Sequence, residues 1–187
     1  MVLSQARFET PLGPMRALAC DAGLVVLDFD DRRGNGAEIV RVCARLRDER
    51  GAPAEIVDDE RYPLVALTRE RVEAYFASDL AALAPGSIPL APGLGSPFQE
   101  RAWRALLEIP LGQTRSYLQQ AAALGAPEAV RAVARANASN YRSIIIPCHR
   151  VIGADGTLTG YGGGLERKRW LLEHEGASAG LFVGTSA

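Results

Sequence analysis

The chain has 187 residues, a length that suits one ordinary domain or two small ones. Hydrophobic residues make up 48% and charged residues 23%, as is typical of a soluble globular protein. No apolar run approaches the roughly 18 residues of a membrane span, and residues 1–10 contain no apolar signal core. We therefore expect a cytoplasmic protein with no membrane partner.

The net charge of −1 is divided unevenly along the chain. Residues 1–97 hold 11 basic and 15 acidic side chains, a balance of −4, whereas residues 98–187 hold 10 basic and 7 acidic, a balance of +3. A modestly basic C-terminal half fits contact with phosphates. A solvated charged surface explains the same asymmetry.

Cysteine and histidine are too sparse for a disulfide framework or a metal centre. The cysteines are Cys20, Cys43 and Cys148, an odd and widely spaced set, and the only histidines are His149 and His174. No Cys-x-x-Cys pair and no His/Cys cluster is present. We expect neither a metal site nor a cofactor.

The first half resembles a small α/β domain with an antiparallel sheet. Turn signals such as Gly13-Pro14 separate short apolar segments, and Ile39, Val42 and Leu46 recur at helical spacing. We predict strands at 8–10, 15–20, 24–29 and 55–57, and helices at 37–50 and 63–78.

Residues 84–95 are rich in proline and glycine and poor in charge, which indicates a connector. A packed irregular loop is the alternative, because Ile88, Leu90 and Leu94 can be buried. We predict a domain boundary after residue 92.

Two Ser-x-x-Gln patterns then predict helix starts, because serine and glutamine at this spacing form a capping box. One begins at Ser96 and the other at Ser116, whose helix extends to residue 124. Gly125 makes a turn, and a second helix covers 127–139. Helix, tight turn and helix form a helix-turn-helix signature, although small helical cores of other proteins look alike.

The remaining elements surround a conspicuous cysteine. The run Ile144–Ile146 predicts a buried strand, and Asp155-Gly156 predicts a hairpin turn. Residues 165–175 form an amphipathic helix with Trp170, Leu171 and Leu172 inward. The tail after residue 176 is expected to be loose.

The segment Pro147-Cys148-His149-Arg150-Val151 suggests a reactive thiol. The thiolate is the nucleophile, so a neighbouring base matters. A structural role is the alternative, because free cysteine often behaves as a small buried hydrophobe. Adjacent residues on a straight strand point to opposite faces. Cys148 and His149 can cooperate only if the chain turns there, which Pro147 favours, or if water bridges them.

This segment and its flanks resemble the O6-alkylguanine-DNA alkyltransferases, also called methylated-DNA–protein-cysteine methyltransferases. The shared residues are Ser116-Tyr117, Arg131, Asn140, Cys148-His149-Arg150-Val151, Gly160-Tyr161, Gly163-Gly164-Leu165, Lys168, Leu171-Leu172 and Glu175. The match is dense over 97–176 and loose before it. The resemblance implies an α+β chain with an RNase H-like domain at 1–92, a winged helix-turn-helix domain carrying the active-site cysteine at 93–176, and a tail at 177–187.

The implied activity is direct-reversal DNA repair. The alkyl group of O6-alkylguanine would pass irreversibly to Cys148 after the base is flipped out of double-stranded DNA, once per protein molecule. O4-alkylthymine is a second candidate substrate. The resemblance also implies binding through the minor groove by a monomer.

The resemblance assigns a role to each matched residue. Cys148 is the nucleophile, His149 is its base through a water, and Glu175 orients the imidazole. Asn140 fixes the active-site loop, and Tyr117 donates a hydrogen bond to the leaving guanine. The implied DNA-contacting residues are Arg131, which fills the space of the flipped base, with Ser116, Ala132 and Arg135. The implied substrate pocket consists of Val151, Tyr161, Gly162, Gly163 and Lys168.

Three other readings remain. An alkyltransferase-like protein would flip damaged bases without repairing them, but such relatives lack the cysteine. A winged-helix regulator would use Cys148 as a redox sensor, which leaves Tyr117, Asn140 and Glu175 without a purpose. A Cys-His hydrolase would turn over an ester or peptide.

Overall fold

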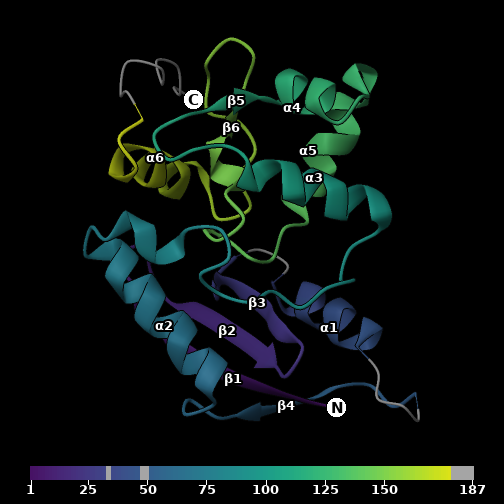
Figure 1. Ribbon diagram of the computed structural model, residues 1–187, viewed down its shortest axis with the longest axis vertical. Helices are drawn as coiled ribbons and strands as arrows, with labels where there is room; N and C mark the ends of the chain where they lie inside the picture. Colours follow the sequence, from purple (N-terminus) through teal and green to yellow (C-terminus); the bar gives the residue numbers. More distant parts are fainter. Residues whose placement is uncertain (33–34, 47–50, 178–187) are drawn as a thin grey trace. The chain divides into compact units, whose positions relative to one another are not determined.

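The chain divides into two compact units, Met1–Leu94 and Gly95–Ala187, at a point close to the predicted boundary after residue 92 (Figure 1). This computed structural model describes residues 1–32, 35–46 and 51–177. Each unit is α+β, so the predicted fold class is confirmed. No helix within these described ranges is long and apolar enough to cross a membrane.

The first unit contains a four-stranded sheet in the order β3-β2-β1-β4. Its strands are β1 (Val2–Phe8), β2 (Met15–Cys20), β3 (Gly23–Phe29) and β4 (Glu55–Asp58). The first three pair antiparallel, as predicted, and β4 joins β1 in parallel. The prediction of a strand at 8–10 was wrong, because Thr10 forms a turn in which its hydroxyl donates to the Gly13 carbonyl at 2.6 Å.

Two helices pack on this sheet. Helix α2 (Pro63–Phe76) contacts β1, β2 and β3, and α1 (Asn35–Arg45) contacts β3 (Figure 1). The predicted helix at 63–78 ends early, because Ser78 adopts a left-handed φ of 76°. Residues 47–50 of the predicted helix at 37–50 lie outside the described ranges.

The connector is a packed irregular loop and not a free linker. After the short 3₁₀ helix η1 (Leu80–Leu83), Leu24 of β3 donates to the Pro89 carbonyl at 2.8 Å and accepts from the Ala91 amide at 3.0 Å. Ile88 and Leu94 are buried, and Leu90 is half-buried. The connector therefore pairs with the edge of the sheet at Leu24.

Three helices open the second unit: α3 (Pro97–Leu107), α4 (Tyr117–Ala123) and α5 (Val130–Ala138). Both predicted capping boxes are present, Ser96 with Gln99 and Ser116 with Gln119. The turn at Gly125 and the 3₁₀ helix η2 (Pro127–Ala129) separate α4 from α5. Helices α4 and α5 therefore form the predicted helix-turn-helix.

A buried amide pair joins α4 to α5. The Gln120 and Asn137 side chains bond reciprocally, with nitrogen–oxygen distances of 2.7 and 3.2 Å. Gln120 also donates to the Ala102 carbonyl of α3 at 3.1 Å. The indole of Trp103 in α3 donates to the Ala136 carbonyl of α5 at 2.8 Å. These bonds fix the three helices relative to one another.

The predicted strand at 144–146 was wrong. These residues form a turn in which the Ile146 amide donates to the Arg142 carbonyl at 2.9 Å and Ile144 adopts a φ of 73°. An apolar run of this length does not distinguish a strand from a buried turn. The chain then enters the 3₁₀ helix η3 (Cys148–Arg150) and the two-residue strand β6 (Val151–Ile152).

Strand β6 pairs in parallel with β5 (Arg115–Ser116) and not with a returning hairpin strand. The predicted turn at Asp155-Gly156 does exist, since the Gly153 amide donates to the Thr157 carbonyl at 2.9 Å. Residues 158–162 beyond it form no second strand, so the hairpin prediction was wrong.

Helix α6 (Leu165–His174) ends the second unit. Lys168, Leu171 and Leu172 face inward, whereas Trp170 is only half-buried and stacks on His174, contrary to prediction. Ala177 packs with Ile152, Leu158 and Leu172, so the first residue of the predicted tail belongs to the core. The rest of that tail, 178–187, lies outside the described ranges.

Candidate active site

Cys148 lies at the first position of η3, directly after the buried turn at 142–147. Its thiol is almost fully buried, with 7% of the residue exposed. The chain therefore turns at this point, and Cys148 and His149 follow one another around a helical turn rather than along a straight strand. This removes the geometric objection to their cooperation.

Asn140 holds the cysteine sulfur and the turn together. Its Nδ2 lies 3.2 Å from Cys148 Sγ and donates to the Ile146 carbonyl at 2.8 Å, and its Oδ1 accepts from the Arg142 amide at 3.0 Å. A hydrogen bond to the charged form of a group favours that form. The amide of Asn140 is therefore placed to stabilise a thiolate.

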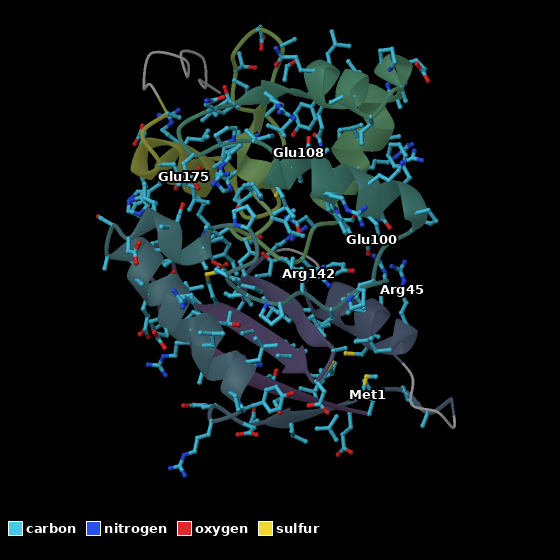
Figure 2. All side chains as sticks on the ribbon, in the orientation of Figure 1. Met1, Arg45, Glu100, Glu108, Arg142 and Glu175 are labelled. Atoms are coloured by element: carbon cyan, nitrogen blue, oxygen red, sulfur yellow. The ribbon has the colours of Figure 1, made fainter. Side chains whose placement is uncertain are left out.

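His149 and Glu175 form a buried pair, with His149 Nε2 3.1 Å from Glu175 Oε1 (Figure 2 labels Glu175 at the end of α6). Burial raises the pKa of Glu175, but His149 and Arg150 outweigh it and hold that pKa well below its usual value. An ionised carboxylate only accepts hydrogen bonds, so Nε2 carries a proton. His149 Nδ1 is buried and has no hydrogen-bond partner among the described residues.

Burial lowers the pKa of His149, and the positive charges of Arg150 and Lys168 add to this effect, while Glu175 opposes it. The imidazole is therefore neutral near pH 7. With the proton on Nε2, the lone pair lies on Nδ1. The arrangement can accept a proton at that atom.

Arg150 was missed by the sequence analysis as a site residue. Its Nε donates to Glu175 Oε2 at 2.7 Å, its Nη2 donates to Glu175 Oε1 at 2.9 Å, and its Nη1 donates to the Ile109 carbonyl at 2.6 Å. The sequence signals were its position beside Cys148 and His149 and its place among the residues shared with the family; neither assigned it a role, because a charged residue is expected to be exposed.

Lys168 bonds to the segment that follows the cysteine. It is fully buried, and its ammonium donates to the carbonyls of Val151 and Thr159. Burial lowers its pKa to about 8. Lys168 therefore fixes the segment 151–159 rather than presenting its charge freely to a ligand.

Tyr117 begins α4 and contacts the same segment. Its hydroxyl lies 3.0 Å from the Gly160 carbonyl and 3.3 Å from the Thr159 carbonyl, and the Lys168 ammonium lies 5.9 Å from its ring centre. Burial and the charge of Cys148 raise the pKa of Tyr117 to about 12, so the hydroxyl keeps its proton at neutral pH.

The remaining predicted pocket residues lie on the loop that precedes α6. The Tyr161 ring stands edge-on to the His149 ring, with centroids 6.4 Å apart. Gly162 is exposed, and the Gly163 carbonyl accepts from Arg167 at 3.1 Å. Val151 donates its amide to the Cys148 carbonyl. Tyr161 therefore lies beside His149 and Val151 beside Cys148, whereas neither glycine is hydrogen-bonded to these two residues.

The predicted DNA-contacting residues form a separate group on the helix-turn-helix. Arg131 and Arg135 are exposed one turn apart on α5, and neither forms an ion pair within the described part of the chain. Ala132 between them is half-buried, and Ser116 caps α4. Across residues 1–32, 35–46 and 51–177, no cluster of His, Cys, Asp and Glu could hold a metal ion.

Comparison with known proteins identifies the family. Residues 97–177 match the family model described as the DNA-binding domain of 6-O-methylguanine DNA methyltransferase. A methylated-DNA–protein-cysteine methyltransferase of Salmonella typhimurium is 40% identical over 181 residues, which cover 93% of this chain and 96% of the relative. One from Methanosarcina acetivorans is 40% identical over 172 residues, covering 92% and 97%.

Solved structures agree with this assignment. The O6-methylguanine methyltransferase of Mycobacterium tuberculosis matches with a TM-score of 0.71 and 36% identity, over 95% of this chain and 96% of the other. The complex of the OGT protein of that organism with DNA matches with a TM-score of 0.70 and 36% identity, over 92% of each chain. The chain belongs to the methylated-DNA–protein-cysteine methyltransferase family.

Proposed function

We propose that this protein repairs O6-alkylguanine in DNA by direct reversal, taking the alkyl group onto Cys148. The observation that carries the proposal is a buried thiol that accepts a bond from Asn140 beside a histidine with an available Nδ1. Membership of the family supports the same chemistry. O4-alkylthymine is a second candidate substrate.

In the first step, Cys148 loses its proton to Nδ1 of His149 through a bridging water. Glu175 accepts the bond from Nε2 and stabilises the imidazolium that forms. Asn140 donates to the resulting thiolate. Positioned proton transfer of this kind accelerates a reaction by about 100-fold or more.

In the second step, the thiolate attacks the alkyl carbon. A sulfur–carbon bond forms while the carbon–O6 bond breaks, and its electron pair passes to the guanine. Tyr117 donates a hydrogen bond to the anionic base, for which its hydroxyl must leave the Gly160 carbonyl. The base then takes up one proton and the imidazolium of His149 gives one up, through water, so guanine and an S-alkylcysteine are the only products.

The helix-turn-helix brings the lesion to the thiol. The alkylated base must leave the stack, which costs a few kcal/mol and least for a damaged base. Arg131 on α5 fills the vacated space, with Arg135, Ala132 and Ser116 against the backbone in the minor groove. The segment from Val151 to Gly163, supported by Lys168, lines the base pocket.

The S-alkyl product is a thioether with no leaving group, so each molecule reacts once. We propose that the protein acts as a monomer and in the cytoplasm. The activity is therefore stoichiometric, and the amount of lesion repaired equals the amount of protein consumed.

Intact mass with peptide mapping tests the proposal, after incubation with a duplex that carries one O6-methylguanine. We expect one methyl group on Cys148, none in Cys148→Ala, and normal transfer by Cys43→Ala, which removes another buried thiol. Lesion binding without a mass change would refute the transfer and favour a flipping-only protein. Neither transfer nor lesion preference would leave a DNA-binding regulator, and repeated ester cleavage would indicate a hydrolase.

A further inference from the structure

All three guanidinium nitrogens of Arg150 donate hydrogen bonds to buried acceptors. Two reach the carboxylate of Glu175 as a fork, and the third reaches the Ile109 carbonyl just after α3. The Arg150 side chain is 10% exposed and that of Glu175 is 1% exposed. Arg150 therefore binds the end of α6 to η3 and to the segment after α3.

The two hydrogen bonds from Arg150 to Glu175 determine how strongly the negative charge of Glu175 acts on His149. Glu175 Oε1 accepts from both His149 Nε2 and Arg150 Nη2. The guanidinium of Arg150 neutralises the Glu175 carboxylate. The carboxylate therefore orients the imidazole of His149 without requiring that the imidazole be positively charged. A buried carboxylate that lost this partner would draw a proton onto the imidazole, because an unpaired buried charge is strongly unfavourable.

We propose that Arg150 is a positioning residue that keeps His149 neutral, with the proton on Nε2 and the lone pair on Nδ1. This inference rests on the proposed function only where it concerns the effect of Arg150 on alkyl transfer. The state of the imidazole itself is a property of the free protein.

The other charged and titratable groups near His149 do not replace Arg150 in this role. Lys168 of α6 also disfavours the imidazolium, but its ammonium donates to backbone carbonyls and not to Glu175. Cys148 precedes the histidine, and Tyr161 presents its ring to the imidazole. Arg150 is the cation whose hydrogen bonds to the Glu175 carboxylate are described above.

The first experiment reads the imidazole directly in the protein without DNA. Only two histidines are present, so ¹⁵N NMR of the histidine side chains gives two sets of signals, and His174→Gln assigns them. We expect neutral His149 with Nε2 protonated near pH 7. Arg150→Met should give an imidazolium at that pH, and Arg150→Met/Glu175→Gln should be neutral again, because both buried charges are gone.

The second experiment measures single-turnover methyl transfer against pH. Removing a positive charge raises the pH at which His149 loses its extra proton, so the acidic limb of the profile in Arg150→Met should move upward by about one pH unit or more. Arg150→Lys keeps the charge and should keep the wild-type limb. Arg32→Met is the matched control, because it breaks another buried arginine–carboxylate pair, with Asp28, in the other unit.

A neutral His149 with Nε2 protonated in Arg150→Met would overturn the inference, as would an unshifted acidic limb. If Arg150→Met does not fold, Arg150→Gln carries the same test, because its amide can still donate to Glu175 but supplies no positive charge; a neutral His149 in Arg150→Gln would overturn the inference. Failure of the wild type to transfer methyl would refute the proposed function and leave the NMR result for Arg150 standing.

Discussion

The buried amide pair between α4 and α5 allows a quantitative test of how the helix-turn-helix is held. Gln120→Leu leaves both polar groups of the Asn137 side chain unsatisfied and also removes the bond to the Ala102 carbonyl. Asn137→Met leaves Gln120 Oε1 without its donor, whereas Gln120 Nε2 keeps its bond to the Ala102 carbonyl. The double variant removes both amides and leaves an apolar contact.

Leaving a buried donor or acceptor unsatisfied costs about 1–3 kcal/mol, whereas replacing both partners by apolar groups is close to neutral. We therefore expect Gln120→Leu, which leaves two groups unsatisfied, to lose about 2–4 kcal/mol of unfolding free energy, and Asn137→Met, which leaves one, to lose about 1–3 kcal/mol. The double variant should lose less than about 1 kcal/mol, so it should be more stable than the sum of the single losses predicts by about 2 kcal/mol or more.

Urea unfolding followed by tryptophan fluorescence measures these losses in the second unit alone, because the only tryptophans are Trp103 and Trp170. The exposed Gln113→Leu is the matched control and should change stability by less than about 0.5 kcal/mol. Single losses near that of the control, or losses that simply add in the double variant, would refute the reasoning.

Three further predictions concern the site. Asn140→Ala should slow alkylation of Cys148 by a small-molecule electrophile by about tenfold at neutral pH and less at high pH, because the thiolate loses a donor; equal slowing at every pH would contradict this. Tyr117→Phe should slow methyl transfer by about tenfold or more while changing stability by less than about 1 kcal/mol, since its hydroxyl bond is exposed; an unchanged rate would exclude it as a donor. Lys168 has a pKa of about 8 in the folded protein, below its value in the unfolded chain, so the folded state binds fewer protons between these two pKa values. The stability of the wild type should therefore rise relative to that of Lys168→Met as the pH increases from 8 toward 10.5. The same pH dependence of both proteins in urea unfolding would contradict this prediction.

Local signals in the sequence predicted the helical half of the second unit well. The capping boxes at Ser96 and Ser116 depend on residues three positions apart, so a single sequence contains the whole signal. The strands at 15–20 and 24–29 were likewise bounded by strong turn residues. Interactions of this kind need no knowledge of the rest of the fold.

The errors came from residues whose environment is set by distant parts of the chain. Ile144–Ile146 has the composition of a strand, but the turn there is fixed by Asn140, whose side chain also reaches the sulfur. Trp170 was expected inward, yet Lys168 occupies that face because two carbonyls from another segment satisfy its ammonium. The part played by Arg150 depends on Glu175, 25 positions away.

The strand order of the first unit also bears on the behaviour of the protein at high concentration. A sheet edge with unpaired amides and carbonyls is a template for intermolecular pairing. On the β3 edge, the segment around Leu90 occupies the backbone groups of Leu24. On the β4 edge, the strand is four residues long and has acidic side chains at both ends, Glu55 and Asp58. A protein that is used up in each reaction has to be made repeatedly, and these two edges lower the risk that newly folded copies aggregate through their sheets.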